Sequence, residues 1–262
     1  MYVDVEGINT YFLHEGSGQP LVLLHGQGIG ACAEVCWSSN IGYFANSGFA
    51  VYAFDQVGFG RTGDRGDFSA DARVAHARGF LQAMRLPRYA LWGQSSGSEI
   101  AARVAVADPQ VRGLILMACG SMAPRLPGNS SVGSPGGLPP NMPEYLPSRE
   151  NARRYLMGTF VKKDRVSEEL VERVFAMSSG RNLESYQARI TVPRPQPVHD
   201  KLPSLNVPTL LLWGKDDRVS VERGILLFRL IPGAEMHVFD NCGHWVQIDQ
   251  EQRVHQLSLI HI

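Results

Sequence analysis

The chain has 262 residues, of which 44% are hydrophobic, and its 25 Lys and Arg residues balance its 25 Asp and Glu residues. This length and apolar content predict one large α/β domain with an insertion, and they argue against a disordered chain. Nucleic-acid and membrane partners are disfavoured because both depend on a basic excess. A small-molecule substrate is therefore the expected partner.

Three further features of the sequence bear on where the protein is located in the cell and on how the chain ends. The first residues, MYVD, do not start a signal peptide, and no apolar run approaches the roughly 18 residues of a membrane span. The four cysteines form no C-x-x-C pair, which favours buried free thiols in a reducing cytoplasm. They are Cys32, Cys36, Cys119 and Cys242. The chain stops at QLSLIHI, apolar to its last residue, and one interpretation of this is a truncated end.

Short apolar runs alternate with helix-like stretches, which indicates a mainly parallel sheet flanked by helices. An opening antiparallel pair is expected first, and runs that are apolar at every position predict strands covered on both faces. The strands are predicted at 3–5, 8–13, 20–26, 50–55, 89–95, 111–118, 208–214 and 235–240. Helical spacing of apolar residues appears at 69–84, 96–107 and 220–230.

The segment 121–202 interrupts this alternation. It holds most of the prolines, with an irregular stretch at 127–143, followed by helical patches near 149–161 and 167–178. Because the strand pattern then resumes, we predict a cap or lid at 121–202, inserted into a core formed by 1–120 and 203–262.

A G-x-S-x-G pattern places Ser95 between Gly93 and Gly97. Alone the match is weak, because 27 glycines make chance matches common, and a turn without chemistry is the alternative. Its position adds weight, since Ser95 lies between a fully apolar strand and a helix. Backbone N–H groups at that helix start are suited to an oxyanion.

A serine nucleophile needs a base, itself oriented by an acid. Asp216 and Asp217 follow the strand at 208–214, and His244 follows the strand at 235–240. All lie beyond the carboxyl ends of strands, in the order serine, acid, histidine. The other histidines are less suitable. By pattern, His14, His76, His199, His255 and His261 are expected on surfaces or in the cap, and His237 is expected to be structural.

The glycine-rich stretch LLHGQGIGA, residues 23–31, follows a strand. It lacks the G-x-G-x-x-G spacing of a dinucleotide site and the lysine of a P-loop, so an oxyanion loop is favoured over nucleotide binding. His25 is expected to anchor this loop by hydrogen bonds. No cofactor and no metal are expected.

Five segments occur in order: HGQGIG, FDQVGFGRTG, GQSSG, WGKDDRV and CGHW. With them the chain resembles the α/β-hydrolase fold family over nearly its whole length. The last two segments resemble those of the meta-cleavage-product hydrolases, which cut a carbon–carbon bond in 2-hydroxy-6-oxo-hexa-2,4-dienoates. The resemblance implies a mostly parallel eight-stranded sheet with a helical cap after the sixth strand.

Residue by residue, the resemblance implies that Ser95 is the nucleophile, His244 the base and proton shuttle, and Asp217 the orienting acid. Asp216 is then a solvated or structural neighbour. The backbone N–H groups of Gln27 and Ser96 would be the oxyanion donors, and Asp55 would brace the loop that follows it. The implied substrate pocket comprises Gly26, Gly28, Cys36, Gln94, Arg173 and Trp245.

The chain departs from the family where Gln94, Ser96 and Ser98 replace Asn, Met and Gly, and where Cys36 replaces a second Asn. Both family asparagines help to hold the dienoate. Arg173 is a rough match, offset by one residue, to a cap arginine that pairs with the substrate carboxylate. The alternative for Arg173 is an ordinary exposed helix charge.

The leading hypothesis is a cofactor-free serine hydrolase that acts on meta-cleavage products and also on small or aryl esters. The alternatives are a carboxylesterase only, or a slow-turnover ligand-binding receptor of the same fold. Ser95 disfavours the dehalogenases and epoxide hydrolases of this fold, which need an aspartate nucleophile. A homodimer is the default expectation for the oligomeric state.

Overall fold

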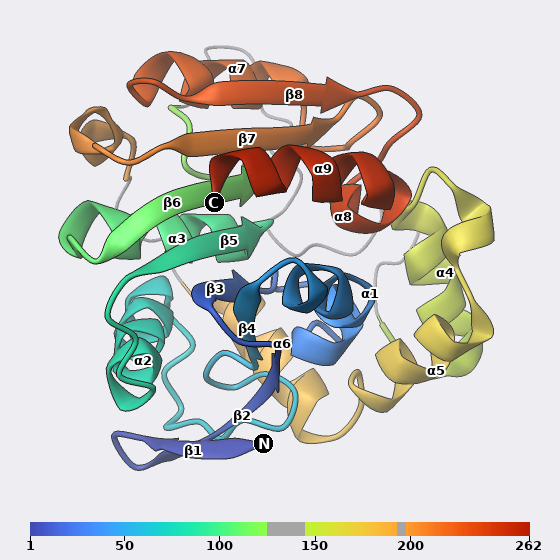
Figure 1. Cartoon of the computed structure of the whole chain (residues 1–262). Coiled ribbons are helices and arrows are strands. Elements are labelled where there is room, and N and C mark those ends of the chain that lie inside the picture. The colour runs from blue at the N-terminus through green and yellow to red at the C-terminus, as the bar shows by residue number, and fades with distance from the viewer. Residues whose placement is uncertain (125–144, 193–197) are drawn as a thin grey trace.

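The computed structural model describes residues 1–124, 145–192 and 198–262. Within these residues one sheet of eight strands has the order β1-β2-β4-β3-β5-β6-β7-β8 (Figure 1). The strands are β1 Tyr2–Val5, β2 Ile8–Glu15, β3 Gln19–Leu24, β4 Phe49–Phe54, β5 Tyr89–Gln94, β6 Val111–Met117, β7 Thr209–Gly214 and β8 Glu235–Phe239. β1 and β2 pair antiparallel, β2 is antiparallel to β4, and the pairs from β3 to β8 are parallel. The predicted eight-stranded, mostly parallel sheet is confirmed.

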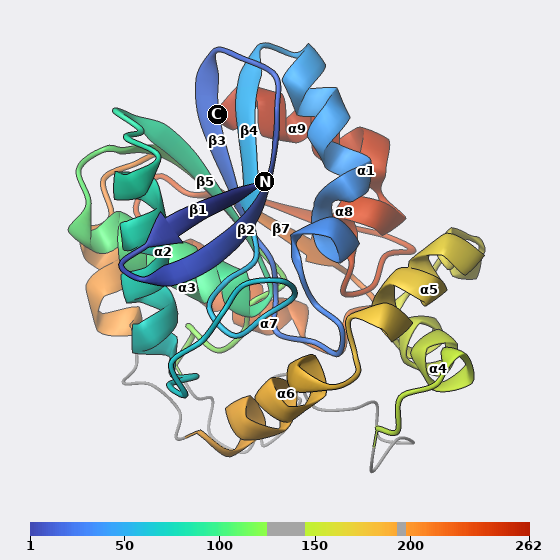
Figure 2. The same ribbon diagram turned by 90° about the horizontal axis from the view of Figure 1, so that it is seen from below.

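Helices cover both faces of the sheet, which is why its central strands are apolar at nearly every position. Figure 2 shows α1 (Ala33–Asn46), α8 (Val246–Asp249) and α9 (Glu251–His261) on one face. It shows α2 (Ala70–Ala83), α3 (Ser96–Ala107) and α7 (Val221–Leu230) on the other. Each face has its own buried apolar cluster, with Trp37 and Phe44 in the first and Phe80 and Ile100 in the second.

Helix α1 was not predicted from the pattern, because its middle contains serines, Asn40 and Gly42, which are weak helix formers. Tertiary packing compensates for this weak propensity. Trp37 and Phe44 are both fully buried and contact Trp92 of β5 edge to face, with ring centroids 5.1 and 5.3 Å apart. Near the end of the chain, Leu257 and Ile262 lie against the same cluster.

Between β6 and β7 the described residues form α4 (Arg149–Thr159), α5 (Glu168–Ala176) and α6 (Arg181–Thr191), with short 3-10 helices at Lys163–Arg165 and His199–Ser204. Helices α4 and α5 lie beyond the carboxyl ends of the strands (Figure 1). The insertion after the sixth strand is confirmed, whereas α6 was not predicted. The irregular stretch at 127–143 lies outside the described residues, and the cap limits at 121 and 202 stay a prediction.

The burial of several side chains corrects the prediction for two histidines and agrees with the predictions for the cysteines and for Asp55. His76 and His255 are buried rather than on the surface, because each ring packs inward against hydrogen-bond partners. All four cysteines are free and buried, as predicted. Asp55 braces its loop as expected, since its carboxylate accepts from the backbone N–H groups of Ala33 and Arg61 at 2.7 and 2.8 Å.

In the described part of the chain no helix is long and apolar enough to span a bilayer.

Candidate active site

Ser95 lies in a strained turn between β5 and α3, with φ 52° and ψ −128°. The turn requires glycine on both sides. A Cβ on Gly93 would lie 2.3 Å from Ser98 Cα, and a Cβ on Gly97 would lie 2.3 Å from Leu24 O. The Ser95 N–H donates to Met117 O at 2.7 Å, while the residue stays half-buried and open to solvent. Strain at a half-exposed serine at a strand-to-helix turn is typical of a nucleophile.

Ser98 stabilises this turn from the buried side. Its hydroxyl donates to Gly93 O at 2.7 Å and accepts from the backbone N–H of Met117 at 2.9 Å. The hydroxyl therefore links β5 to β6 beside the turn that holds Ser95. A glycine at this place, as the resemblance implied, could not make these bonds.

The histidine and the acid come together beyond β7 and β8. His244 Nδ1 lies 2.9 Å from Asp217 Oδ2 and 3.0 Å from Oδ1, and the Asp217 side chain is fully buried. Asp216 instead accepts from the backbone N–H of Cys242 at 3.3 Å. The backbone N–H of Val219 donates to Asp217 Oδ1 at 2.9 Å and fixes the carboxylate. This pairing engages Nδ1 and orients the imidazole, so any base chemistry of the ring would fall to Nε2.

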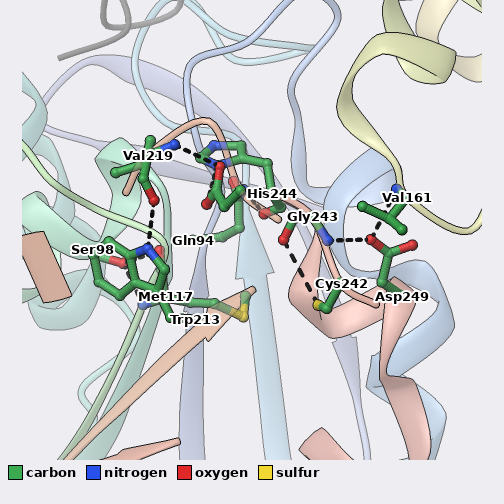
Figure 3. Close-up of polar contacts among 11 residues, drawn as sticks. Gln94, Ser98, Met117, Val161, Trp213, Val219, Cys242, Gly243, His244 and Asp249 are labelled. Carbon is green, nitrogen blue, oxygen red and sulfur yellow. Dashed lines mark hydrogen bonds and ion pairs between the residues drawn. The ribbon is translucent and has the colours of Figure 1, made fainter. Parts of the chain in front are cut away.

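Two further contacts bring the serine turn, the histidine and the glycine-rich loop together. Gln94 Nε2 donates to the backbone oxygen of His244 at 3.3 Å (Figure 3). A Cβ on Gly26 would lie 2.5 Å from Gln94 Oε1 and 3.1 Å from Ser95 Cβ. Ser95, His244 and the loop at 23–31 therefore meet at one edge of the sheet.

His25 anchors the glycine-rich loop, as predicted. Its Nε2 accepts from the backbone N–H of Gln56 at 3.0 Å, so the proton is on Nδ1, which donates to Gly26 O at 2.7 Å. Burial lowers the pKa of His25 to about 3. The ring is therefore neutral and structural.

Asp249, in α8, holds the segment that precedes His244. Its carboxylate accepts from the backbone N–H groups of Gly243 at 2.8 Å, Val161 at 3.3 Å and Lys162 at 3.2 Å. Figure 3 shows Asp249 between Gly243 and Val161. The residue therefore joins the histidine loop to the cap. The sequence did not single it out, because an acid in a short helix has no distinguishing local signal.

The side chains of Gln27 and Ser96 both accept hydrogen bonds from Arg73, at 3.1 and 3.3 Å. These are the two residues whose backbone N–H groups are the predicted oxyanion donors. Arg73 was not predicted to take part, because an arginine in a helical pattern normally has its charge in solvent. The hydrogen bonds of Arg73 to Gln27 and Ser96 join separate segments of the sequence, so only the folded structure shows them.

A model of the alpha/beta hydrolase family matches residues 21–257. The chain belongs to the α/β-hydrolase family. It is 32% identical over 284 residues to a 2-hydroxy-6-oxononadienedioate/2-hydroxy-6-oxononatrienedioate hydrolase of Paraburkholderia phymatum, covering 98% of this chain and 93% of that protein. It is also 32% identical over 264 residues to a 2-hydroxymuconate semialdehyde hydrolase of Pseudomonas putida, covering 96% and 89%.

A solved structure resembles this α/β-hydrolase along its whole length. A meta-cleavage product hydrolase from Pseudomonas fluorescens superposes with a TM-score of 0.86 at 27% identity, covering 99% of this chain and 96% of that one. The predicted family and the prediction of an enzyme are confirmed.

In this α/β-hydrolase the cap lies close above the predicted pocket. A Cβ on Gly28 would lie 2.1 Å from the Tyr155 hydroxyl oxygen of α4, and Trp245 stacks on Phe160 with ring centroids 5.3 Å apart. Cys36 is buried, and burial raises the pKa of its thiol to about 12, so the thiol is protonated. Two neutral side chains, Tyr155 and Cys36, therefore lie against the glycine-rich loop.

The cap presents two arginines in different settings. Arg173 hydrogen-bonds Ser38 and forms an ion pair with Glu169. Arg189 instead lies 3.6 Å from the centre of the Phe59 ring and donates to Gly58 O at 2.9 Å. Its Nε is shielded from solvent and has no hydrogen-bond partner among the described residues.

The described residues contain no group of three or more His, Cys, Asp or Glu side chains arranged to hold a metal ion.

Proposed function

We propose that this α/β-hydrolase is a cofactor-free serine hydrolase that cleaves the carbon–carbon bond beside the 6-oxo group of 2-hydroxy-6-oxo-dienoates. The observation that carries the proposal is the His244–Asp217 hydrogen bond at the sheet edge that also holds the strained Ser95. The substrate class is supported by the relatives, whose names refer to such dienoates.

In the proposed mechanism His244 first assists the movement of a proton that converts the dienol to its keto form. Ser95 Oγ then bonds to the carbon of the 6-oxo group, its proton passes to His244 Nε2, and the carbonyl electron pair moves onto oxygen. The backbone N–H groups of Gln27 and Ser96 stabilise this oxyanion. When the oxyanion collapses the carbon–carbon bond breaks, and His244 returns the proton to the departing carbon. Water, deprotonated by His244, finally hydrolyses the acyl–Ser95 ester.

A half-buried arginine of the cap, Arg189, supports an anionic substrate. Arg189 is charged at neutral pH even though burial, together with the charge of Arg73, lowers its pKa to about 9. Among the described residues its guanidinium contacts the Gly58 oxygen and the Phe59 ring, neither of them a carboxylate, so a substrate carboxylate would supply the counter-charge. We assign the carboxylate contact to Arg189 rather than to Arg173, which is already paired with Glu169.

The primary test follows the loss of visible absorbance of a 6-phenyl ring-cleavage product, with Ser95→Ala as the control. The proposal expects many turnovers per enzyme, all dependent on Ser95. A single burst that then stalls would assign the chain to ligand-binding receptors. No bleaching, combined with Ser95-dependent hydrolysis of an aryl ester, would assign it to carboxylesterases.

A paired substitution tests the carboxylate contact. Arg189→Gln is expected to raise KM for the dienoate by roughly 10-fold or more, since a charge-assisted hydrogen bond is lost, and to leave KM for a neutral aryl ester unchanged. Arg173→Gln is the matched control and should change neither KM. Equal effects of the two substitutions on the dienoate would contradict the assignment.

A further inference from the structure

Arg73, in the first turn of α2, is a buried arginine whose hydrogen-bond partners are neutral side chains, with only 3% of its surface exposed. Its Nε and Nη2 donate to Gln56 Oε1 at 3.0 and 2.9 Å. Its Nη1 donates to Gln27 Oε1 at 3.1 Å, and both Nη1 and Nη2 lie 3.3 Å from Ser96 Oγ. Among the described residues no carboxylate forms an ion pair with it, so its charge has no direct counterion.

A buried guanidinium without a counterion is unfavourable for folding. Burial lowers the pKa of Arg73 to about 10, so the side chain nevertheless stays charged at neutral pH. The charge of Glu99 opposes this lowering without forming an ion pair with Arg73, while a second arginine nearby adds to the positive potential. Arg73 and Arg189 both lie over the Phe59 ring, at 5.2 and 3.6 Å, and the charge of Arg73 helps to lower the pKa of Arg189.

The location of this charge relates it to the reaction. Gln27 and Ser96 belong to separate elements, the loop after β3 and the first residue of α3, and Arg73 holds both by their side chains. The backbone N–H groups of the same two residues are the oxyanion donors of the proposed mechanism. The guanidinium therefore contacts both residues whose backbone N–H groups would receive the negative charge that develops when Ser95 Oγ bonds to the carbonyl carbon.

We propose that Arg73 is a positioning residue for the oxyanion site, holding Gln27 and Ser96 in register and supplying buried positive charge that stabilises the tetrahedral oxyanion. The inference rests on the proposed function, since it requires Ser95 to be the nucleophile. It explains why a charge without a counterion is kept in the interior: the counter-charge arises during turnover. A charge placed in advance needs no rearrangement at the moment of reaction.

The test measures kcat and KM for an aryl ester, together with inhibition by phenylboronic acid. Boron accepts the Ser95 oxygen and becomes an anionic tetrahedral centre, which makes the inhibitor a stand-in for the oxyanion. Arg73→Gln is expected to lower kcat by about 100-fold, as loss of an oxyanion donor does, with KM changed less than about threefold. Boronic acid affinity should fall by a similar factor.

Arg73→Lys keeps the positive charge but lacks the branched guanidinium group that contacts both Gln27 and Ser96. The kcat of Arg73→Lys should therefore be about tenfold higher than that of Arg73→Gln. Arg78→Gln, an exposed arginine on the same helix, is the matched control and should leave kcat and inhibition unchanged. If Arg73→Gln does not fold, Ser96→Ala removes one acceptor of Arg73 without altering the backbone donor. It should lower kcat by roughly fivefold, about one hydrogen bond.

Three outcomes would overturn the inference. In the first, Arg73→Gln or Ser96→Ala retains wild-type kcat while Ser95→Ala is inactive. In the second, the Lys and Gln variants lose kcat equally, which would make Arg73 a packing residue. In the third, kcat falls while boronic acid affinity stays at the wild-type value. Failure of the proposed function looks different, because the unaltered protein would then show no Ser95-dependent turnover.

Discussion

Gln94, the residue before Ser95, donates a hydrogen bond to the backbone oxygen of His244 across 3.3 Å. This contact joins the end of β5 to the loop after β8, which lies 150 residues away in the sequence. It therefore holds the backbone of His244, and with it the imidazole, at a fixed position relative to the serine turn. Several expected outcomes depend on this arrangement.

Replacing Gln94 with Leu keeps the side-chain size but leaves the buried His244 oxygen without its donor. We expect kcat to fall by roughly 5- to 10-fold, the equivalent of about one hydrogen bond, with KM little changed. Steady-state kinetics on an aryl ester measure this. Gln82→Leu, at an exposed site on α2, is the control. Wild-type kcat in Gln94→Leu would show that the loop keeps its position without the bond.

Asp217→Asn is expected to lower kcat by about 10⁴-fold, because the amide can no longer both orient His244 and stabilise its protonated form. Asp216→Asn is the matched control, since Asn retains an oxygen to accept from the Cys242 N–H. Thermal unfolding should be similar for the two variants. Comparable losses of kcat in both would contradict the assignment of Asp217 as the orienting acid.

Asp249→Ala should leave three backbone N–H groups at the histidine loop and the cap without an acceptor. The free energy of unfolding is expected to decrease by about 3 kcal/mol, measured by urea denaturation. Asp249→Asn retains one acceptor oxygen and should lose roughly half as much. A loss below about 0.5 kcal/mol in the alanine variant would mean that the loop does not depend on this carboxylate.

Buried histidines make stability depend on pH. Burial lowers the pKa of His25 to about 3 and that of His76 to about 4, against 6.5 in the unfolded chain. Between about pH 4 and 6.5 the unfolded chain binds more protons, so the free energy of unfolding falls as pH falls. Each histidine should contribute a loss of about 2 kcal/mol at pH 5.

Asp55 opposes this trend. Burial raises its pKa to about 6 from 3.8, so between these values the folded chain binds the extra proton and gains about 1.4 kcal/mol at pH 5. His25 and His76 outweigh it, and His255, whose pKa burial also lowers to about 4, adds to their effect, so net stability should fall from pH 7 to pH 5. Urea unfolding at both pH values should show a loss about 2 kcal/mol smaller in His76→Gln than in wild type. An unchanged difference would place the pH dependence elsewhere.

Local features of the sequence were enough to predict the sheet and the three loops at its edge. Fully apolar runs mark strands covered on both faces, and the glycines around Ser95 mark a turn that excludes larger side chains. Helix α1 was missed, because its weak local propensity is compensated by packing of Trp37 and Phe44 that no local pattern reveals.

The partners of each charge were decided only by the tertiary structure. The contacts of Arg73 with Ser96, and of Asp249 with Val161, join residues 23 and 88 positions apart, so no spacing rule reports them. The two cap arginines look alike as sequence, yet one is paired with Glu169 and the other lies against Phe59. The sequence by itself determined the architecture and the identity of the candidate catalytic residues, because strand patterns and tight turns depend on neighbouring residues. Burial and pairing of charges depend on which distant segments meet, and only the folded chain decides that.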